Sequence, residues 1–190
     1  MQRRVLATFV VLSVFGLILF RPSPADAQPV PPNRNAFSVS IVNFNPSVFA
    51  VGLAYPIAPD WDLTFSYAFQ PGATATGSLI AAGGRYHLKV ATPGMSAHLG
   101  AGVGISGTAL TGFRAANSSG VFLSGGATLA FNQQFGAYGS ATVFALGGGT
   151  STVFDLGIQA RLSPRIAGQL GYVSFGGRAA PYLGVTVALR

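Results

Sequence analysis

The sequence predicts an all-β protein whose strands close into an antiparallel, up-and-down transmembrane β-barrel of about ten strands. Three observations lead to this fold class. From Ala36 onward, apolar side chains recur at every second position, which is the period of a strand with one apolar face. Charged residues make up 8 % of the chain and hydrophobic residues 49 %, too little charge to cover a soluble surface. The alternating segments approach the roughly nine to eleven residues that a tilted strand needs to cross a bilayer.

Residues 1–27 are expected to be a secretory signal peptide. Two arginines follow Met1-Gln2, residues 5–20 form an apolar run, and Ala25-x-Ala27 has the small residues of a cleavage site. An uncleaved membrane anchor is the alternative, but the run is shorter than the roughly 18 to 20 residues of a spanning helix. Cleavage leaves eight Lys and Arg residues against three Asp. Residues 28–35 then form a Pro-rich periplasmic leader, and residues 36–190 the barrel.

The strands follow from alternation between two faces. In the segment 61–69, Leu63, Phe65 and Tyr67 share one face, and Asp62 and Thr64 share the other. The same period predicts strands at 36–44, 48–57, 61–69, 77–90, 95–107, 120–131, 135–145, 150–162, 165–175 and 180–190. Eight strands is the alternative count. A secreted β-sandwich would also alternate, but its outer face should carry more charge than this chain has.

The connections are expected to differ between the two ends of the barrel. Tight turns are predicted at 56–60, 91–94, 132–134 and 163–164, and looser connections at 45–47, 70–76, 108–119, 147–149 and 176–178. Aromatic side chains near the tight turns would form a girdle at the membrane interface. These residues are Tyr55, Trp61, Tyr86, Phe131 and Phe135.

This pattern resembles the small outer-membrane β-barrel proteins of diderm bacteria. The resemblance covers the signal peptide and residues 36–190, and it is architectural, with no specific family motif. It implies a location in the outer membrane, contact with outer-membrane lipid, and insertion by the outer-membrane assembly machinery. Members of this group usually end on an aromatic residue, whereas this sequence ends on Leu189 and Arg190.

The sequence gives little support for a nucleic-acid partner or for a cofactor. The basic residues form no dense patch, so nucleic acid is not expected as a partner. Arg114 and Arg178, in predicted outer loops, are candidates for contact with lipopolysaccharide phosphates, and solvated surface charge is the alternative. Residues 102–107 match G-x-G-x-x-G, but no helical pattern and no acidic residue follow, so no dinucleotide cofactor is expected. The chain also lacks Cys and Glu.

A cluster of polar side chains is predicted in the lumen near the tight turns. Its members, by strand parity, are Asp62, Arg85, His87, Lys89, His98 and Arg161. A turn centred on Pro93-Gly94 would set His98 opposite Lys89, and a turn centred on Thr92-Pro93 would set it opposite His87.

Three roles are open for this cluster. Lumen packing around Asp62 is favoured, because such groups would be costly on the lipid face. A metal site at His87, His98 and Asp62, and His98-dependent catalysis with Ser96, are the alternatives, and neither a metal nor a catalytic residue is assigned. The expected role is therefore structural, or a narrow passive pore lined by Gly, Ser and Ala with weak anion preference. A His-dependent enzyme acting on lipid and a soluble secreted β-protein are the other readings.

Overall fold

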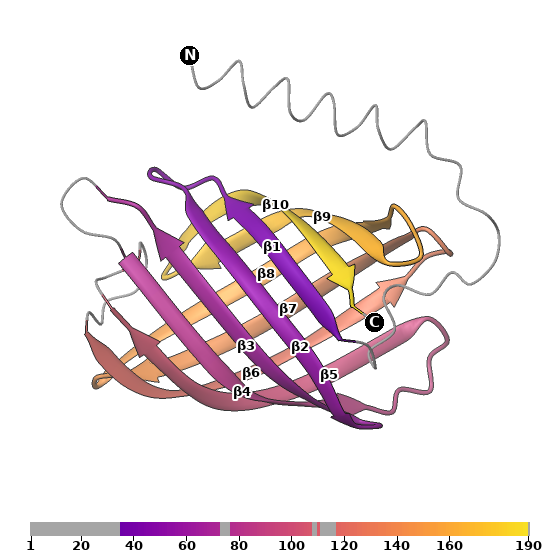
Figure 1. The fold of residues 1–190 in the computed structure, drawn as a ribbon, viewed down its shortest axis with the longest axis horizontal. Helices are drawn as coiled ribbons and strands as arrows, with labels where there is room; N and C mark the ends of the chain where they lie inside the picture. The colour runs from indigo at the N-terminus through magenta and orange to yellow at the C-terminus, as the bar shows by residue number, and fades with distance from the viewer. Residues whose placement is uncertain (1–34, 73–76, 108–109, 111–116, 190) are drawn as a thin grey trace, which may run out of the picture.

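A computed structural model describes residues 35–72, 77–107, 110 and 117–189, and these residues form ten antiparallel strands (Figure 1). The strands are β1 (Ala36–Val42), β2 (Val48–Ala58), β3 (Trp61–Gln70), β4 (Gly77–Leu88), β5 (Met95–Ser106), β6 (Ser118–Ala130), β7 (Phe135–Leu146), β8 (Gly149–Arg161), β9 (Ile166–Phe175) and β10 (Arg178–Ala188). The predicted signal peptide and nearly all of the predicted leader lie outside the described residues, as does Arg190.

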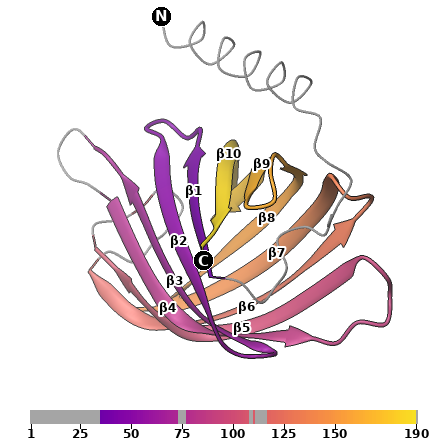
Figure 2. The ribbon, with the colours of Figure 1, turned by 45° about the vertical axis from the view of Figure 1, so that its right-hand side comes forward.

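The sheet closes because β1 pairs with both β2 and β10. Ser40, for example, lies between Ala50 on one side and Gly184 on the other. Figures 1 and 2 show indigo β1 beside yellow β10, with the strands tilted around a common axis. Closure gives every strand two hydrogen-bonded neighbours, which is what a sheet needs in hydrocarbon. The predicted ten-strand barrel is confirmed, and the alternative of eight strands is wrong.

The two faces of the wall differ as the alternation predicts. Outward positions carry large apolar side chains with much of their surface exposed. They include Val39, Leu53, Phe65, Val103, Leu123, Leu156 and Leu183. Neighbouring inward positions on the same strands carry Ser38, Thr64, Gly102 and Ser124, so the apolar side of each strand is the outside of the barrel.

None of the residues that the structure describes belongs to a helix long and apolar enough to cross a membrane.

The two ends of the barrel differ in what they hold, and they are called the terminal end and the loop end. The terminal end holds both ends of the described chain, where the Leu189 amide donates to the carbonyl of Asn35 at 2.7 Å. At the opposite end, the loop end, the sequence predicts connections that are looser on the whole. Two of them are instead tight two-glycine hairpins, at Gly147-Gly148 and Gly176-Gly177. All four glycines have positive φ, the conformation that a type I′ turn requires.

Apolar side chains fill the lumen at the loop end. This set of residues, called the lumen plug below, is Val42, Val48, Leu79, Ala81, Leu110, Phe122, Phe144, Leu146, Val173, Ala180 and Tyr182. The rings of two of its members, Phe122 and Phe144, lie 5.5 Å apart. Leu110 comes from the connection between β5 and β6 and is also fully buried. The expectation of a lumen lined by Gly, Ser and Ala therefore holds only for the terminal half.

Candidate functional site

The strongest polar interactions in the lumen converge on one carboxylate. Asp62 on β3 is 1 % exposed, and its Oδ2 accepts bonds from Arg85 Nη2 at 2.6 Å and Arg85 Nε at 3.1 Å. The same oxygen accepts a 2.6 Å bond from His87 Nε2. Arg85 and His87 both belong to β4. These three residues and His98 are called the polar cluster below.

Local strand geometry explains the convergence. Asp62 and Arg85 are direct partners across β3 and β4, and His87 is two residues further along β4 on the same face. The His87 amide donates to the Asp60 carbonyl at 2.8 Å, which holds the end of β4 against the Pro59-Asp60 turn. A guanidinium and an imidazole from β4 therefore share one oxygen, Oδ2, of a buried carboxylate.

His98 faces the lumen from the next strand. The register pairs it directly with His87, so the turn follows the second of the two predicted arrangements, and Lys89 is not opposite His98. Its ring extends over Gly126 on β6: a Cβ added at Gly126 would lie 2.7 Å from His98 Cε1. The missing side chain at position 126 makes room for the imidazole.

We expect Gly126→Ala to destabilise the barrel by about 1–3 kcal/mol, because the new methyl would also lie 2.9 Å from the Gly139 carbonyl oxygen, which cannot move freely. Urea unfolding in lipid vesicles measures the loss. Gly84→Ala is the matched control, since its Cβ would meet nothing closer than 3.6 Å from Trp61 and should cost far less. Equal losses in both variants would contradict the close packing of His98 and Gly139 around Gly126.

Two predicted members of the cluster lie elsewhere. The Lys89 side chain is 83 % exposed beyond the end of β4, and its Nζ lies 3.6 Å from Asp60 Oδ2 in the turn. Arg161 donates to the carbonyls of Ser163 and Pro164 in the connection between β8 and β9. Sequence parity placed both residues on the inward side, but strand ends let their long side chains turn toward the rim.

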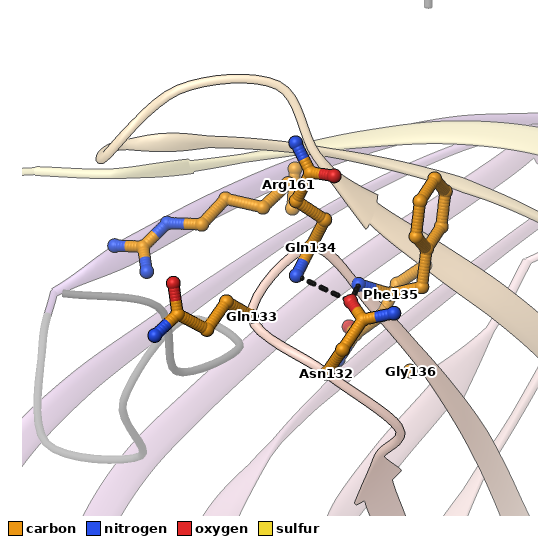
Figure 3. A pocket seen from close by; sticks show the side chains of 8 residues that line it. Asn132, Gln133, Gln134, Phe135, Gly136 and Arg161 are labelled. Carbon is orange, nitrogen blue, oxygen red and sulfur yellow. Dashed lines mark hydrogen bonds between the residues drawn. The ribbon is translucent and has the colours of Figure 1, made fainter. Parts of the chain in front are cut away.

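Arg161 instead lines a shallow pocket at the rim of the terminal end (Figure 3). Asn132, Gln133 and Gln134 from the connection between β6 and β7 bring carboxamides to it. The Asn132 side-chain Oδ1 accepts hydrogen bonds from the backbone N–H groups of Gln134 and Phe135, and these bonds hold the turn in place. Asn132 is therefore occupied in holding the loop.

The metal and catalytic alternatives gain no geometric support. Within the described residues, no three His, Cys, Asp or Glu side chains are grouped to hold a metal ion. Ser96 is paired with Thr128 and faces the same side as His98, yet no hydrogen bond joins Ser96 to His98 in the described part of the chain. The hydrogen bonds of Asp62 within the cluster join β3 to β4 near the terminal end.

A second polar group was missed by sequence reasoning. The hydroxyls of Tyr138 on β7 and Tyr182 on β10 are hydrogen-bonded to each other, and Tyr182 is also a hydrogen-bond partner of Asp155 on β8. The parity of each strand places all three side chains inward. An inward tyrosine in each of two strands was the available signal, but parity does not say that the two side chains meet over β8 and β9.

The five aromatic residues of the predicted girdle all lie near the terminal end. Trp61 and Tyr86 are direct partners on β3 and β4, with ring centroids 5.1 Å apart. Tyr55, Phe131 and Phe135 are exposed. A second aromatic group, not predicted, lies on the outer face near the loop end, where Phe69 stacks on both Phe49 and Tyr67.

Comparison with known proteins adds structural neighbours and no family. No protein-family model matches the sequence. No curated protein matches it either. The structure is similar to the N-terminal β-barrel domain of Pseudomonas aeruginosa OprF, at 12 % identity and a TM-score of 0.41, covering 86 % of this chain and 100 % of that one.

Two further solved structures are similar. A de novo designed transmembrane β-barrel has 12 % identity and a TM-score of 0.49, with 86 % of this chain and 100 % of that chain covered. The KdgM porin has 9 % identity and a TM-score of 0.47, with 82 % and 99 % covered. The assignment of the fold rests on the strand pairing itself, which gives the architecture of a small outer-membrane β-barrel protein.

Proposed function

We propose that this protein is an integral outer-membrane β-barrel with a structural role, whose lumen is closed at the loop end. The lumen plug is the observation that carries the closed state. Phe122, Phe144 and Leu146 are buried inside the barrel, and Leu110, from the connection between β5 and β6, is buried in the same apolar cluster. A layer of apolar side chains is a barrier to water and ions.

The apolar outer face supports the membrane location. Large side chains such as Leu123 and Leu156 are more than half exposed, which would be costly in water over so many strands. The terminal end would face the periplasm, since both ends of the described chain lie there. The passive pore remains the second candidate, because the terminal half of the lumen carries the polar side chains of β3–β9.

At about pH 6, planar bilayers containing the refolded protein are expected to show no conductance steps, because the plug offers no hydrated path. Fractionation should place the protein in the outer membrane, and the folded form should change its gel mobility on boiling. Stable channels under these conditions would favour the passive pore. Recovery in the soluble periplasm would favour a secreted β-protein.

A location in the outer membrane implies contact with lipid and with the proteins that insert the barrel. Outer-membrane lipid would contact the exposed apolar face, and the outer-membrane assembly machinery would insert the barrel. Arg178, exposed at the start of β10 on the loop end, is a candidate for lipopolysaccharide phosphates, while Arg114 lies outside the described residues. We propose no enzymatic activity: His87 is bonded to Asp62, and His98 faces the lumen and not the surrounding lipid.

A further inference from the structure

The shallow pocket at the rim of the terminal end, called the rim pocket below, lies on the lumen side of the wall (Figure 3). The connection between β6 and β7 forms one side of it, and the last residues of β8 form the other. The Arg161 amide donates to the Gln134 carbonyl at 2.7 Å, so the two sides are tied together. Gly136 is the direct partner of Gln159, and a Cβ added at Gly136 would lie 3.4 Å from Gln159 Nε2. A larger residue at position 136 would therefore take up the space beside this carboxamide.

Arg161 gives the rim pocket a positive charge in a defined position. Its Nε donates to the Ser163 carbonyl at 3.3 Å, and its Nη2 donates to the Pro164 carbonyl at 3.2 Å. Carbonyl oxygens orient a guanidinium but do not neutralise it. Of the residues that line the pocket in the described structure, Arg161 alone is charged. The acid on the same strand, Asp155, lies roughly 20 Å away along β8, beyond the reach of a charge in physiological salt. A negatively charged group is therefore the favoured occupant.

The carboxamides around Arg161 indicate what kind of anion fits. Gln133, Gln134 and Gln159 each bring a carbonyl acceptor and an amide donor to the pocket. Figure 3 shows the Gln133 carboxamide and the Arg161 guanidinium pointing toward one another from the two sides. A phosphodiester or an acetate ion has acceptors only, so it would leave the carboxamide carbonyls without donors. The C-terminal end of a peptide has a carboxylate that matches a guanidinium and, beside it, an amide with both a donor and an acceptor.

We propose that the rim pocket binds the C-terminal carboxylate of a peptide. Arg161 holds the carboxylate, and the glutamine carboxamides hold the adjoining peptide amide. Under the membrane placement proposed above, the terminal end faces the periplasm, so the peptide reaches the pocket from that side. The binding chemistry does not depend on the closed lumen, because the lumen plug lies at the opposite end of the barrel.

Three small probes separate a peptide site from a general anion site. N-acetyl-dialanine has both the carboxylate and the peptide amide, its C-terminally amidated form lacks the carboxylate, and acetate lacks the amide. Titrations of the refolded, isotope-labelled protein in detergent micelles at about 0.15 M salt, followed by NMR, give the three dissociation constants. N-acetyl-dialanine should bind at least about tenfold more tightly than either of the others, because each of them lacks one set of hydrogen bonds. Equal binding of the amidated form or of acetate, or no saturable binding of N-acetyl-dialanine, would overturn the proposal.

Three variants place the binding in the rim pocket. Arg161→Gln should weaken the binding of N-acetyl-dialanine about tenfold, and Gln133→Ala, in an exposed turn, should weaken it about threefold. Arg165→Gln is the matched control, because it removes an exposed charge from the same connection without changing the pocket lining, and its affinity should stay within about twofold of the native value. The change of gel mobility on boiling verifies that each variant is folded, and Gln133→Ala tests the site even if Arg161→Gln does not fold.

Two outcomes of this series would contradict the site. Equal losses in Arg161→Gln and Arg165→Gln would mean that the probe responds to the charge of the rim and not to the pocket. Native affinity in Gln133→Ala would mean that the carboxamides do not recognise the peptide amide. Either result would overturn the peptide site and leave the closed lumen standing, since conductance measures the plug independently.

Discussion

Replacing Phe122 and Phe144 together with Ala is expected to open the lumen. The two rings belong to the plug and lie 5.5 Å apart, and each side chain is buried. Each single truncation should cost about 3–5 kcal/mol of folding free energy, because it leaves a cavity that neighbouring strands cannot close. The double variant should lose less folding free energy than the sum of the two single losses, because the rings contact each other. Conductance steps should appear in planar bilayers only for the double variant.

Phe154→Ala is the matched control for this experiment. Phe154 lies on β8 and is more than half exposed on the outer face, so its truncation also removes a phenyl ring but leaves the plug intact. It should lower stability by removing contact with lipid and should remain silent in bilayers. Urea unfolding in vesicles can be followed through Trp61, the single tryptophan. A silent double variant that is fully folded would contradict the assignment of these two rings as the barrier.

The barrel could be predicted because a closed sheet in a membrane has a strict period of two. A shift of one residue would move Leu63 into the lumen and Asp62 into lipid, so each strand allows only one orientation. The polar cluster benefited from the same rule: parity placed Asp62, Arg85, His87 and His98 on the inner wall. Parity does not determine the register between β4 and β5, because that register depends on whether the turn is centred on Thr92-Pro93 or on Pro93-Gly94.

The plug could not be derived from alternation, because its residues break the alternation. Val121-Phe122-Leu123 and Val143-Phe144-Ala145-Leu146 are apolar on both faces, and both runs lie toward the loop end of their strands. Such runs, at corresponding heights in neighbouring strands, were the signal for a filled lumen. The contact between Tyr138 and Tyr182 depends on where β7 and β10 lie around the closed barrel. The sequence of a single strand does not determine how the sheet curves to bring these two side chains together.

The second large effect is expected at the ion pair between Asp62 and Arg85. Arg85→Ala should cost about 3–5 kcal/mol, because it leaves a carboxylate that is 1 % exposed with only His87 as a partner. Asp62→Ala should cost less, about 2 kcal/mol, since the Arg85 guanidinium is 29 % exposed and can be hydrated from the lumen. The order of the two single variants follows from which charge is more deeply buried.

The double variant separates this explanation from simple loss of contact. Removing Asp62 and Arg85 together leaves no unpaired charge, so Asp62→Ala/Arg85→Ala should be more stable than Arg85→Ala alone. The free energies of unfolding of all four proteins in lipid vesicles complete the cycle, and His87→Gln, which keeps a side-chain donor for Asp62, should stay closest to the native value. If the double variant were the least stable of the set, the side chains would be acting mainly through packing. A recovery in the double variant means that the buried carboxylate at position 62 is tolerated only because β4 brings a guanidinium to it.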